Sequence, residues 1–353
     1  MIHTLRAIDF RCWGNVSLEL APAGGIFVGN NAQGKTSLLE AACVLLRLQS
    51  PRTHKLTSLT RFSSPGFGIA ADFHESLRKV RHVNGSLVCE VDAEPRATTS
   101  EYLRDSGLVV WMGNDDLELI RGSGETRRRY LDFLGAQWDP FYRTHWSRYR
   151  RALKMKNALL KSSYLDEKQI TSWEEMMIES GTILAEVRQQ MLHRLQPAIA
   201  EAHRAISSSR ETISIDYRRS GGEDLRTAMH QAHERERRTH QSAVGPHRDD
   251  ISLQINDLNA AEFASEGQQR TLAIALKLAQ GAMLEQQRKL CPIYLIDDIF
   301  GELDPVRRNA LMQALPTNAQ KWITTTNLDW WEEKVPFSQL PCYEVSQATI
   351  TRI

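Results

Sequence analysis

Gly29-Asn30-Asn31-Ala32-Gln33-Gly34-Lys35-Thr36 is the stretch of this sequence that decides the fold. Its pattern, Gly-x4-Gly-Lys-Thr, is typical of a loop whose backbone N–H groups, together with a helix N-terminus, point toward phosphate oxygens. Lys35 adds a positive charge, and the Thr36 hydroxyl is a suitable ligand for Mg²⁺. The stretch predicts a nucleotide triphosphate site that runs from Gly29 to Ser37.

The residues on either side of the loop support this interpretation. Ile26-Phe27-Val28 reads as the end of a buried strand, and residues 37–48 carry apolar side chains at helical spacing before Ser50-Pro51. Strand, loop and helix therefore follow in the order that a phosphate-binding α/β domain needs. The alternative, a glycine-bearing turn with a surface lysine, is disfavoured by this context.

The composition is that of an ordinary soluble globular protein with room for two or more domains. The 353 residues are 41% hydrophobic and 25% charged. No window holds eighteen uninterrupted apolar residues, and the first residues lack the features of a secretion signal, so we expect the cytoplasm. Five scattered cysteines without a Cys-x-x-Cys pair favour reduced thiols over disulfides or zinc.

The overall net charge of +1 does not indicate a nucleic-acid partner, but one segment is strongly basic. Residues 121–160 hold eight arginines and two lysines against three acidic residues, a local net charge of +7. Aromatic residues are interleaved with them, as on surfaces that meet nucleic-acid phosphates. The candidate DNA contacts are Arg127, Arg128, Arg129, Arg148, Arg150, Arg151 and Lys154. The alternative is a solvated helix face whose aromatic residues belong to the core.

Helical periodicity continues through residues 173–206, where we expect Pro197 to kink or divide the helix. We therefore predict an α/β protein with an inserted, mainly helical arm. The expected parts are 1–121, a β-rich region with the phosphate loop; 122–240, the arm; and 241–353, the remainder of the α/β domain. Two further expectations in the first part are a hairpin over Val80–Val91, turning at Asn84-Gly85, and a strand at Leu108–Met112.

A second anion site is suggested by Ser265-Glu266-Gly267-Gln268-Gln269, which precedes a helical pattern. Ser265 and Gln268 have the spacing of a capping box, in which each side chain bonds an exposed backbone N–H. Ser265, flexible Gly267 and the helix N-terminus can equally receive a phosphate. The two interpretations are compatible.

Two carboxylates end the apolar run Ile293-Tyr294-Leu295-Ile296-Asp297-Asp298. A strand here would bring Asp297 beside the phosphate loop, where it holds Mg²⁺ largely through water. Asp298 is then placed to polarise an attacking water. An isolated Asp-Asp is more often an ordinary strand end, but the two preceding motifs favour the catalytic interpretation.

In order and spacing, these motifs resemble those of the ABC-type ATPase heads of chromosome-maintenance proteins, which are related to the SMC heads. Within that group the sequence most resembles the RecF family. The resemblance covers essentially the whole chain. It is carried by Phe10-Arg11, Gly29–Thr36, Leu117–Gly122, Arg127–Asp132, Gly245–Asp250, Ser265–Leu278 and Asp297–Asp304.

The resemblance implies roles for single residues. Lys35 and Thr36 would serve ATP and Mg²⁺, Asp297 would complete the magnesium shell, and Asp298, with Lys35, would be catalytic. Ser265, Gly267 and Gln268 would contact the γ-phosphate held by a second subunit. Asp304 would lie at the dimer seam, and Arg11 would face the nucleotide.

The resemblance also implies an activity. It predicts a weak, DNA-stimulated ATPase that forms an ATP-induced homodimer, clamps double-stranded DNA beside single-stranded gaps, and works at the nucleoid with RecO- and RecR-type mediators to help load recombinase. A transporter ATPase subunit, a nuclease with a related head and an ATP-binding protein without useful turnover are the alternatives.

Two departures from the family pattern, and one difference from transporter ATPases, bear more on hydrolysis than on binding. Met112-Gly113-Asn114-Asp115-Asp116 stands where Phe-x-Pro-Glu-Asp is usual in the family. Thr324-Thr325-Thr326-Asn327 stands where transporter ATPases carry a switch histidine, as is usual in RecF-like chains. Ala32 replaces a common glycine, a mild change if its backbone is helical or extended.

His247 with Asp249 and Asp250 could suggest a metal site, although a structural turn is favoured because no cluster of further ligands accompanies them.

Overall fold

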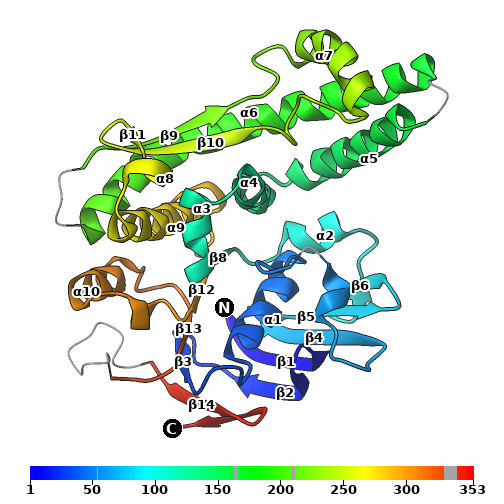
Figure 1. Cartoon of the computed structure of the whole chain (residues 1–353). Coiled ribbons are helices and arrows are strands. Elements are labelled where there is room, and N and C mark those ends of the chain that lie inside the picture. Colours follow the sequence, from blue (N-terminus) through cyan, green and yellow to red (C-terminus); the bar gives the residue numbers. More distant parts are fainter. Residues whose placement is uncertain (54, 163–165, 208–210, 330–339) are drawn as a thin grey trace. The chain divides into compact units, whose positions relative to one another are not determined.

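The structure is a computed structural model that describes residues 1–53, 55–162, 166–207, 211–329 and 340–353 (Figure 1). The chain divides into two compact units. The first consists mainly of Met1–Asp116 and Ile274–Ile353, and the second mainly of Leu117–Arg204 and Ser209–Ala273. The expected arm boundary at residue 240 therefore falls inside the second unit, because the strand that follows it pairs within that unit.

The first unit contains an antiparallel sheet in the order β2-β1-β4-β5-β6-β7. Its strands are β1 (Ile2–Phe10), β2 (Trp13–Glu19), β4 (Gly66–Phe73), β5 (Ser76–Val83), β6 (Ser86–Val91) and β7 (Glu94–Pro95). Val83 pairs with Ser86, so β5 and β6 form the expected hairpin around Asn84 and Gly85. Both turn residues have positive φ, +51° and +80°, which asparagine and glycine tolerate.

A second sheet in the same unit positions the site, with the order β15-β14-β3-β13-β12-β8. Its strands are β3 (Gly24–Val28), β8 (Val109–Gly113), β12 (Ile293–Asp297), β13 (Lys321–Thr325), β14 (Cys342–Ser346) and β15 (Thr349–Arg352). All neighbours are parallel except the β14–β15 pair. Asp297 pairs with Gly113 on one side and with Thr324 on the other, so the ends of three strands meet at one edge.

Helices accompany these sheets within the first unit. They are α1 (Lys35–Arg47), α2 (Thr99–Arg104) and α10 (Pro305–Ala314), with short 3₁₀ turns η1 (Leu56–Leu59), η2 (Asn114–Asp116) and η3 (Phe300–Glu302). Nearly every residue of α1 is buried, including Leu38, Leu39 and Leu45. This burial fixes the helix that carries the phosphate loop. A further helix, α9 (Glu266–Arg288), begins in the second unit and ends in the first.

The second unit is mainly helical, as expected, with a small antiparallel sheet in the order β11-β10-β9. Its elements are α3 (Leu117–Arg121), α4 (Gly124–Trp138), α5 (Tyr142–Leu160), α6 (Glu167–Ile206), β9 (Ile213–Arg218), α7 (Leu225–Thr239), β10 (Asp250–Ile255), β11 (Leu258–Asn259) and α8 (Ala260–Phe263). Its core includes Tyr142, Tyr149, Ala152, Met177, Leu184 and Met229.

Pro197 does not divide α6, which runs through it for 40 residues. The expected division is therefore wrong; the proline occupies an exposed position of the helix.

Among the described residues, no helix is both long and apolar enough to span a membrane.

Candidate nucleotide-binding site

The phosphate loop joins β3 to α1, and its shape depends on Gly34. This residue precedes the helix with φ +101°, in the left-handed region that favours glycine. A Cβ atom there would lie 2.7 Å from Cys12 Sγ and 2.9 Å from the Trp13 ring. The Trp13 indole N–H donates to the Gly34 carbonyl over 3.2 Å. Glycine is therefore required both by the backbone conformation and by the lack of space.

Ala32 adopts the left-handed conformation as well, with φ +64°. A mild effect was expected only for a helical or extended backbone, and Ala32 does not meet that condition. An L-residue in this region costs about 1–2 kcal/mol because Cβ approaches the following carbonyl oxygen. The loop thus carries strain at the position where glycine was expected.

Lys35 is buried and lies against the loop. Its Nζ donates to the carbonyl oxygens of Gly29, over 2.6 Å, and Asn30, over 2.9 Å. Burial lowers the pKa of Lys35, while the charges of Asp298 and Asp297 oppose that shift. The ammonium therefore feels the charge of both carboxylates, and it is held by carbonyl oxygens that a phosphate oxygen could replace.

Asp297 connects the end of β12 to the phosphate loop. Its Oδ1 accepts hydrogen bonds from Thr36 Oγ1 and Thr324 Oγ1, each over 2.8 Å. Burial raises the pKa of Asp297 despite these two bonds. A carboxylate beside a threonine hydroxyl is the donor set that suits Mg²⁺, a hard cation that prefers oxygen ligands. The residues present therefore fit the metal that the sequence implies.

Asp298 follows with a left-handed backbone, φ +52°. Its N–H donates to Thr324, to the carbonyl oxygen over 3.2 Å and to Oγ1 over 3.0 Å. Burial raises the pKa of Asp298; the Lys35 charge opposes the shift, and the charges of Asp297 and Glu302 add to it. A raised pKa suits a carboxylate that accepts a proton from water.

The turn after β8 also reaches this site. Asn114 Nδ2 donates to Glu302 Oε1 over 2.6 Å and to the Asp298 carbonyl oxygen over 3.4 Å. Asp116 accepts from the Gly113 N–H and forms a 2.8 Å ion pair with Lys277. Our sequence analysis identified the altered loop but missed the contacts of Asn114, Glu302 and Thr324. These contacts follow from the parallel pairing of β8 and β13 with β12, and the register of that pairing is visible only in the folded structure.

Arg11, expected to face the nucleotide, is engaged by α1. Its Nε and Nη2 donate to the two carboxylate oxygens of fully buried Glu40, each over 2.8 Å, and Nη1 donates to the Ser58 carbonyl oxygen. The hydrogen bonds to Glu40 are the main reason why the pKa of Arg11 is raised. Its nucleotide contact stays a prediction, and any such contact has to compete with Glu40.

The expected capping box at the start of α9 is present. Gln268 N–H donates to Ser265 Oγ over 3.3 Å, and Ser265 N–H donates to Gln268 Oε1 over 2.8 Å. Asp304 plays a similar part at α10, where its Oδ1 accepts from the Arg307 N–H over 3.0 Å. The contacts of Ser265, Gly267, Gln268 and Asp304 with a second subunit's nucleotide stay predictions.

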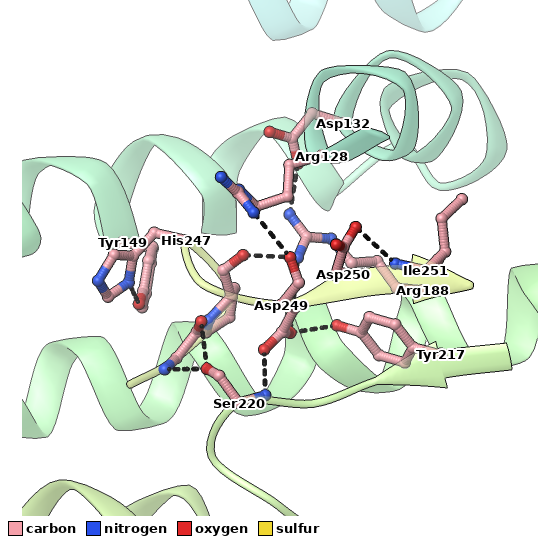
Figure 2. Close-up of polar contacts among 12 residues, drawn as sticks. Arg128, Asp132, Tyr149, Arg188, Tyr217, Ser220, His247, Asp249, Asp250 and Ile251 are labelled. Atoms are coloured by element: carbon pink, nitrogen blue, oxygen red, sulfur yellow. Dashed lines mark hydrogen bonds and ion pairs between the residues drawn. The ribbon is translucent and has the colours of Figure 1, made fainter. Parts of the chain in front are cut away.

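The basic segment separates into buried and exposed cations. Arg127 forks onto Asp250 over 2.7 and 2.8 Å, and Arg128 donates to the Asp249 carbonyl oxygen over 3.0 Å, a bond drawn in Figure 2. Lys156, which contributed to the local charge of +7, is fully buried between two glutamates, Glu174 and Glu236. These three cations are bound by partners within the second unit.

Other cations of the segment lie at the surface. Arg148 pairs with Glu179, and the Arg150 guanidinium lies 4.5 Å from the Trp146 ring centre. Arg151 and Lys154 are exposed, and within the described ranges neither forms an ion pair. Arg150, Arg151 and Lys154 are therefore the candidates best placed to meet phosphates, while Arg129 is partly buried.

The Gly245–Asp250 turn is tied into a polar network, the Arg188 cluster, which we define as Asp132, Tyr142, Arg188, Tyr217 and Asp249. Figure 2 labels four of these residues, Asp132, Arg188, Tyr217 and Asp249. Arg188 donates to Asp132 over 2.7 Å, to the Tyr142 hydroxyl over 2.9 Å and to the Pro246 carbonyl oxygen over 2.9 Å. Buried Asp249 accepts from the Tyr217 hydroxyl and the Ser220 N–H. These contacts explain the role of the Gly245–Asp250 turn, which the sequence alone did not reveal. The turn joins β10 to the helices of the second unit.

His247 belongs to the same turn. Its Nδ1 lies 2.6 Å from the Tyr149 hydroxyl, and its Nε2 lies 3.1 Å from the Ser242 carbonyl oxygen. Burial lowers the pKa of His247 to about 4. Both ring nitrogens are thus engaged within the protein, as in a structural turn.

Comparison with known proteins extends these findings. The chain is 32% identical to the DNA replication and repair protein RecF of Lactococcus lactis, over 98% of this chain and 97% of that one. It is 34% identical to the RecF protein of Thermosynechococcus vestitus, over 93% and 91% of the two chains. No protein-family model matches the chain.

Solved structures of related proteins also superpose on this chain. A structure of the recombination mediator protein RecF with ATP, in the RecFOR pathway, superposes with a TM-score of 0.88 at 27% identity and covers 100% of this chain and 97% of that one. An SMC head bound to the C-terminal winged-helix domain of ScpA superposes with a TM-score of 0.56 at 15% identity, covering 100% and 97%. The second likeness shows the shared ATPase-head fold alone.

Proposed function

The chain belongs to the RecF family of DNA replication and repair proteins, and from this premise we propose that it is an ATP-dependent DNA-binding protein of recombinational repair. The observation that carries the ATP part is the convergence on Asp297, where hydroxyls from the phosphate loop and from β13 meet one carboxylate. Asp298 lies next to it, with a raised pKa.

The residues divide the work of binding and hydrolysis. The loop N–H groups and Lys35 bind phosphates, and Thr36 with Asp297 would hold Mg²⁺, whose charge offsets that of the phosphates. Asp298 accepts a proton from the attacking water. We expect slow hydrolysis, as the resemblance to the family implies.

We propose that ATP joins two copies of the chain. Ser265, Gly267 and Gln268 at the start of α9 present backbone N–H groups at a helix N-terminus, which suits the γ-phosphate held by a partner copy. Asp304 lies near the seam. In the closed pair, Arg150, Arg151 and Lys154 meet phosphates of double-stranded DNA at gaps, and RecO- and RecR-type mediators act with the pair at the nucleoid in the cytoplasm.

The experiment that tests the ATP-binding part is the Lys35→Ala variant. It should lose both ATP binding and ATP-dependent dimerisation, measured by isothermal titration and by mass from light scattering. The variant removes the positive charge together with the two hydrogen bonds from Lys35 Nζ to the carbonyl groups of Gly29 and Asn30. Retention of both properties would overturn the proposal.

The DNA part is tested by salt dependence. Arg151→Ala and Lys154→Ala together should reduce the slope of log Kd against log salt by about 2, because each phosphate contact contributes roughly 0.9. The matched control is Arg121→Ala, a cation of the same segment that is paired with Glu118. An unchanged slope in the double variant would remove this face from the DNA site.

The alternatives of a nuclease and of an ATP-binding protein without useful turnover make other predictions. Incubation of plasmid with the protein and Mg²⁺ or Mn²⁺ should leave the DNA uncut, whereas cleavage would favour the nuclease. A steady-state ATPase assay with and without gapped DNA separates slow turnover from binding without turnover. The family membership favours the repair function over a nuclease or a transporter subunit.

A further inference from the structure

Asn114 occupies a position in the nucleotide site that its sequence neighbours do not explain. It begins η2, directly after β8, and the β8–β12 register places Gly113 opposite Asp297. Its side chain therefore lies beside the residue that follows, Asp298. The two hydrogen bonds from Nδ2, to Glu302 Oε1 over 2.6 Å and to the Asp298 carbonyl oxygen over 3.4 Å, connect three chain segments of the site.

The orientation of the Asn114 amide follows from its partners. A carboxylate oxygen and a backbone carbonyl oxygen only accept hydrogen bonds, so the NH₂ group has to face both. The opposite atom, Oδ1, is then buried, and within the described part of the chain it has no hydrogen-bond donor. A buried unpaired acceptor costs about 1–3 kcal/mol. Asn114 is thus a poor choice for stability alone, which points to a role in function.

The backbone of Asp298 needs external support. Its φ of +52° lies in the left-handed region, which is unfavourable for L-residues although aspartate tolerates it better than most. Thr324 holds the N–H of Asp298 from one side, and Asn114 holds its carbonyl group from the other. The same amide group ties down Glu302, a second carboxylate close enough to influence Asp298.

We propose that Asn114 is a positioning residue for ATP hydrolysis, which fixes the Asp298 backbone and the Glu302 carboxylate so that the Asp298 side chain stays beside Lys35. This inference rests on the proposed ATPase function and adds a residue to it. Asn114 acts through Asp298, and its loss should affect the rate of hydrolysis while the phosphate loop continues to bind ATP.

The test is single-turnover ATP hydrolysis, measured for the full-length protein with Mg²⁺ and gapped DNA. Asn114→Ala should lower kcat about tenfold, the kinetic equivalent of one net hydrogen bond, with an unchanged Kd for ATP. Its unfolding midpoint should not fall, because the variant also removes the unpaired Oδ1. Asn318→Ala is the matched control: its amide donates to Glu285 over 3.3 Å at an exposed position of the same unit.

The outcomes distinguish the inference from its premise. If the wild type hydrolyses ATP and Asp298→Asn does not, but Asn114→Ala matches the Asn318→Ala control, the inference is overturned and the proposed function stands. The inference would also be overturned, in favour of a structural role, if Asn114→Ala lost ATP affinity by the same factor as its hydrolysis rate. A lower unfolding midpoint of Asn114→Ala, alongside the slower hydrolysis, would overturn it as well. If the wild type shows no hydrolysis under any condition, the proposed ATPase function fails, and the inference fails with it.

Discussion

The nucleotide site of the first unit and the Arg188 cluster of the second unit are both built from buried charged groups, but they balance charge differently. In the nucleotide site, Asp297 and Asp298 face one lysine, and burial raises the pKa of each. Asp250, the residue after Asp249 of the cluster, shows the difference: burial would raise its pKa, but the hydrogen bonds and charge of Arg127 more than offset this, so its pKa is lowered.

This difference distinguishes a ligand site from a structural network. In the Arg188 cluster each carboxylate faces a guanidinium, a hydroxyl or an N–H, so the protein itself completes the interactions. In the nucleotide site, negative charge exceeds what Lys35 can neutralise, and a bound cation would restore the balance. Removal of a charge should therefore have opposite effects on stability in the two regions, which the following predictions test.

The largest effect is expected for Asp298→Asn. Loss of the general base should reduce hydrolysis by about 10²- to 10⁴-fold. The Kd for ATP should change little, because the phosphate loop is untouched, so the ATP-bound dimer should accumulate. Hydrolysis is followed by phosphate release and the dimer by its mass. A variant that hydrolyses ATP normally would exclude Asp298 from the catalytic role.

Arg188→Met should lower the free energy of unfolding by about 3–5 kcal/mol, because it leaves buried carboxylates without their cation. Arg188 is 2% exposed. Urea denaturation followed by circular dichroism measures the change. Arg194→Met, an exposed arginine on the same helix, is the control and should change stability by less than about 0.5 kcal/mol. Equal stability of the two variants would contradict the structural role of the cluster.

Asp297→Asn should have the opposite effect on the protein without ligand and raise its stability by about 1 kcal/mol. The folded-state pKa of Asp297 lies above the ordinary value of 3.8, so the folded state binds more protons, and stability falls as the pH rises from that value through the raised pKa. The variant should lack this part of the pH dependence.

The same variant should lose the stabilisation that Mg²⁺ and ATP give the wild type, about 2.7 kcal/mol at a hundredfold excess over Kd. Thermal unfolding between pH 4 and pH 8, with and without MgATP, measures both effects. A less stable Asp297→Asn protein would show that the carboxylate is structural, and the contrast with the Arg188 cluster would disappear.

The smallest effect is expected for Ala32→Gly. Relief of the left-handed strain, about 1–2 kcal/mol, is partly cancelled by the greater freedom of glycine in the unfolded chain, about 0.5–1 kcal/mol. The net gain should stay below about 1 kcal/mol in thermal unfolding. Ala70→Gly, in the regular strand β4, should instead destabilise the protein. A loss of stability in Ala32→Gly would show that the loop is not strained at this residue.

The sequence alone was informative where local patterns decide structure. The phosphate loop, the strand before Asp297, the Asn84-Gly85 hairpin and the Ser265–Gln268 capping box all depend on residues close together in the chain. Backbone conformation at Ala32 was not predictable, because its positive φ is imposed by the loop as a whole. The sequence also left open whether Pro197 kinks or divides α6, because a proline removes one backbone hydrogen bond in either case and the fold decides whether the helix continues.

Contacts between distant segments were harder to predict. The local charge of residues 121–160 does not reveal that Lys156 is buried between glutamates or that Arg127 is held by Asp250, 123 positions away. In the same way, Asn114 reads as part of an altered loop until the sheet places it beside Asp298. Pairing partners set these roles, and they depend on the fold.

The central claim is that ATP joins two copies of this chain into a clamp on DNA, and a DNA-binding titration with mass measured alongside tests it most directly. Duplex, single-stranded and gapped DNA would be titrated with ATP, with ADP and without nucleotide. The account predicts tight binding to gapped DNA and the mass of two chains with ATP only. Equal affinity in all three conditions, with the mass of one chain throughout, would contradict it.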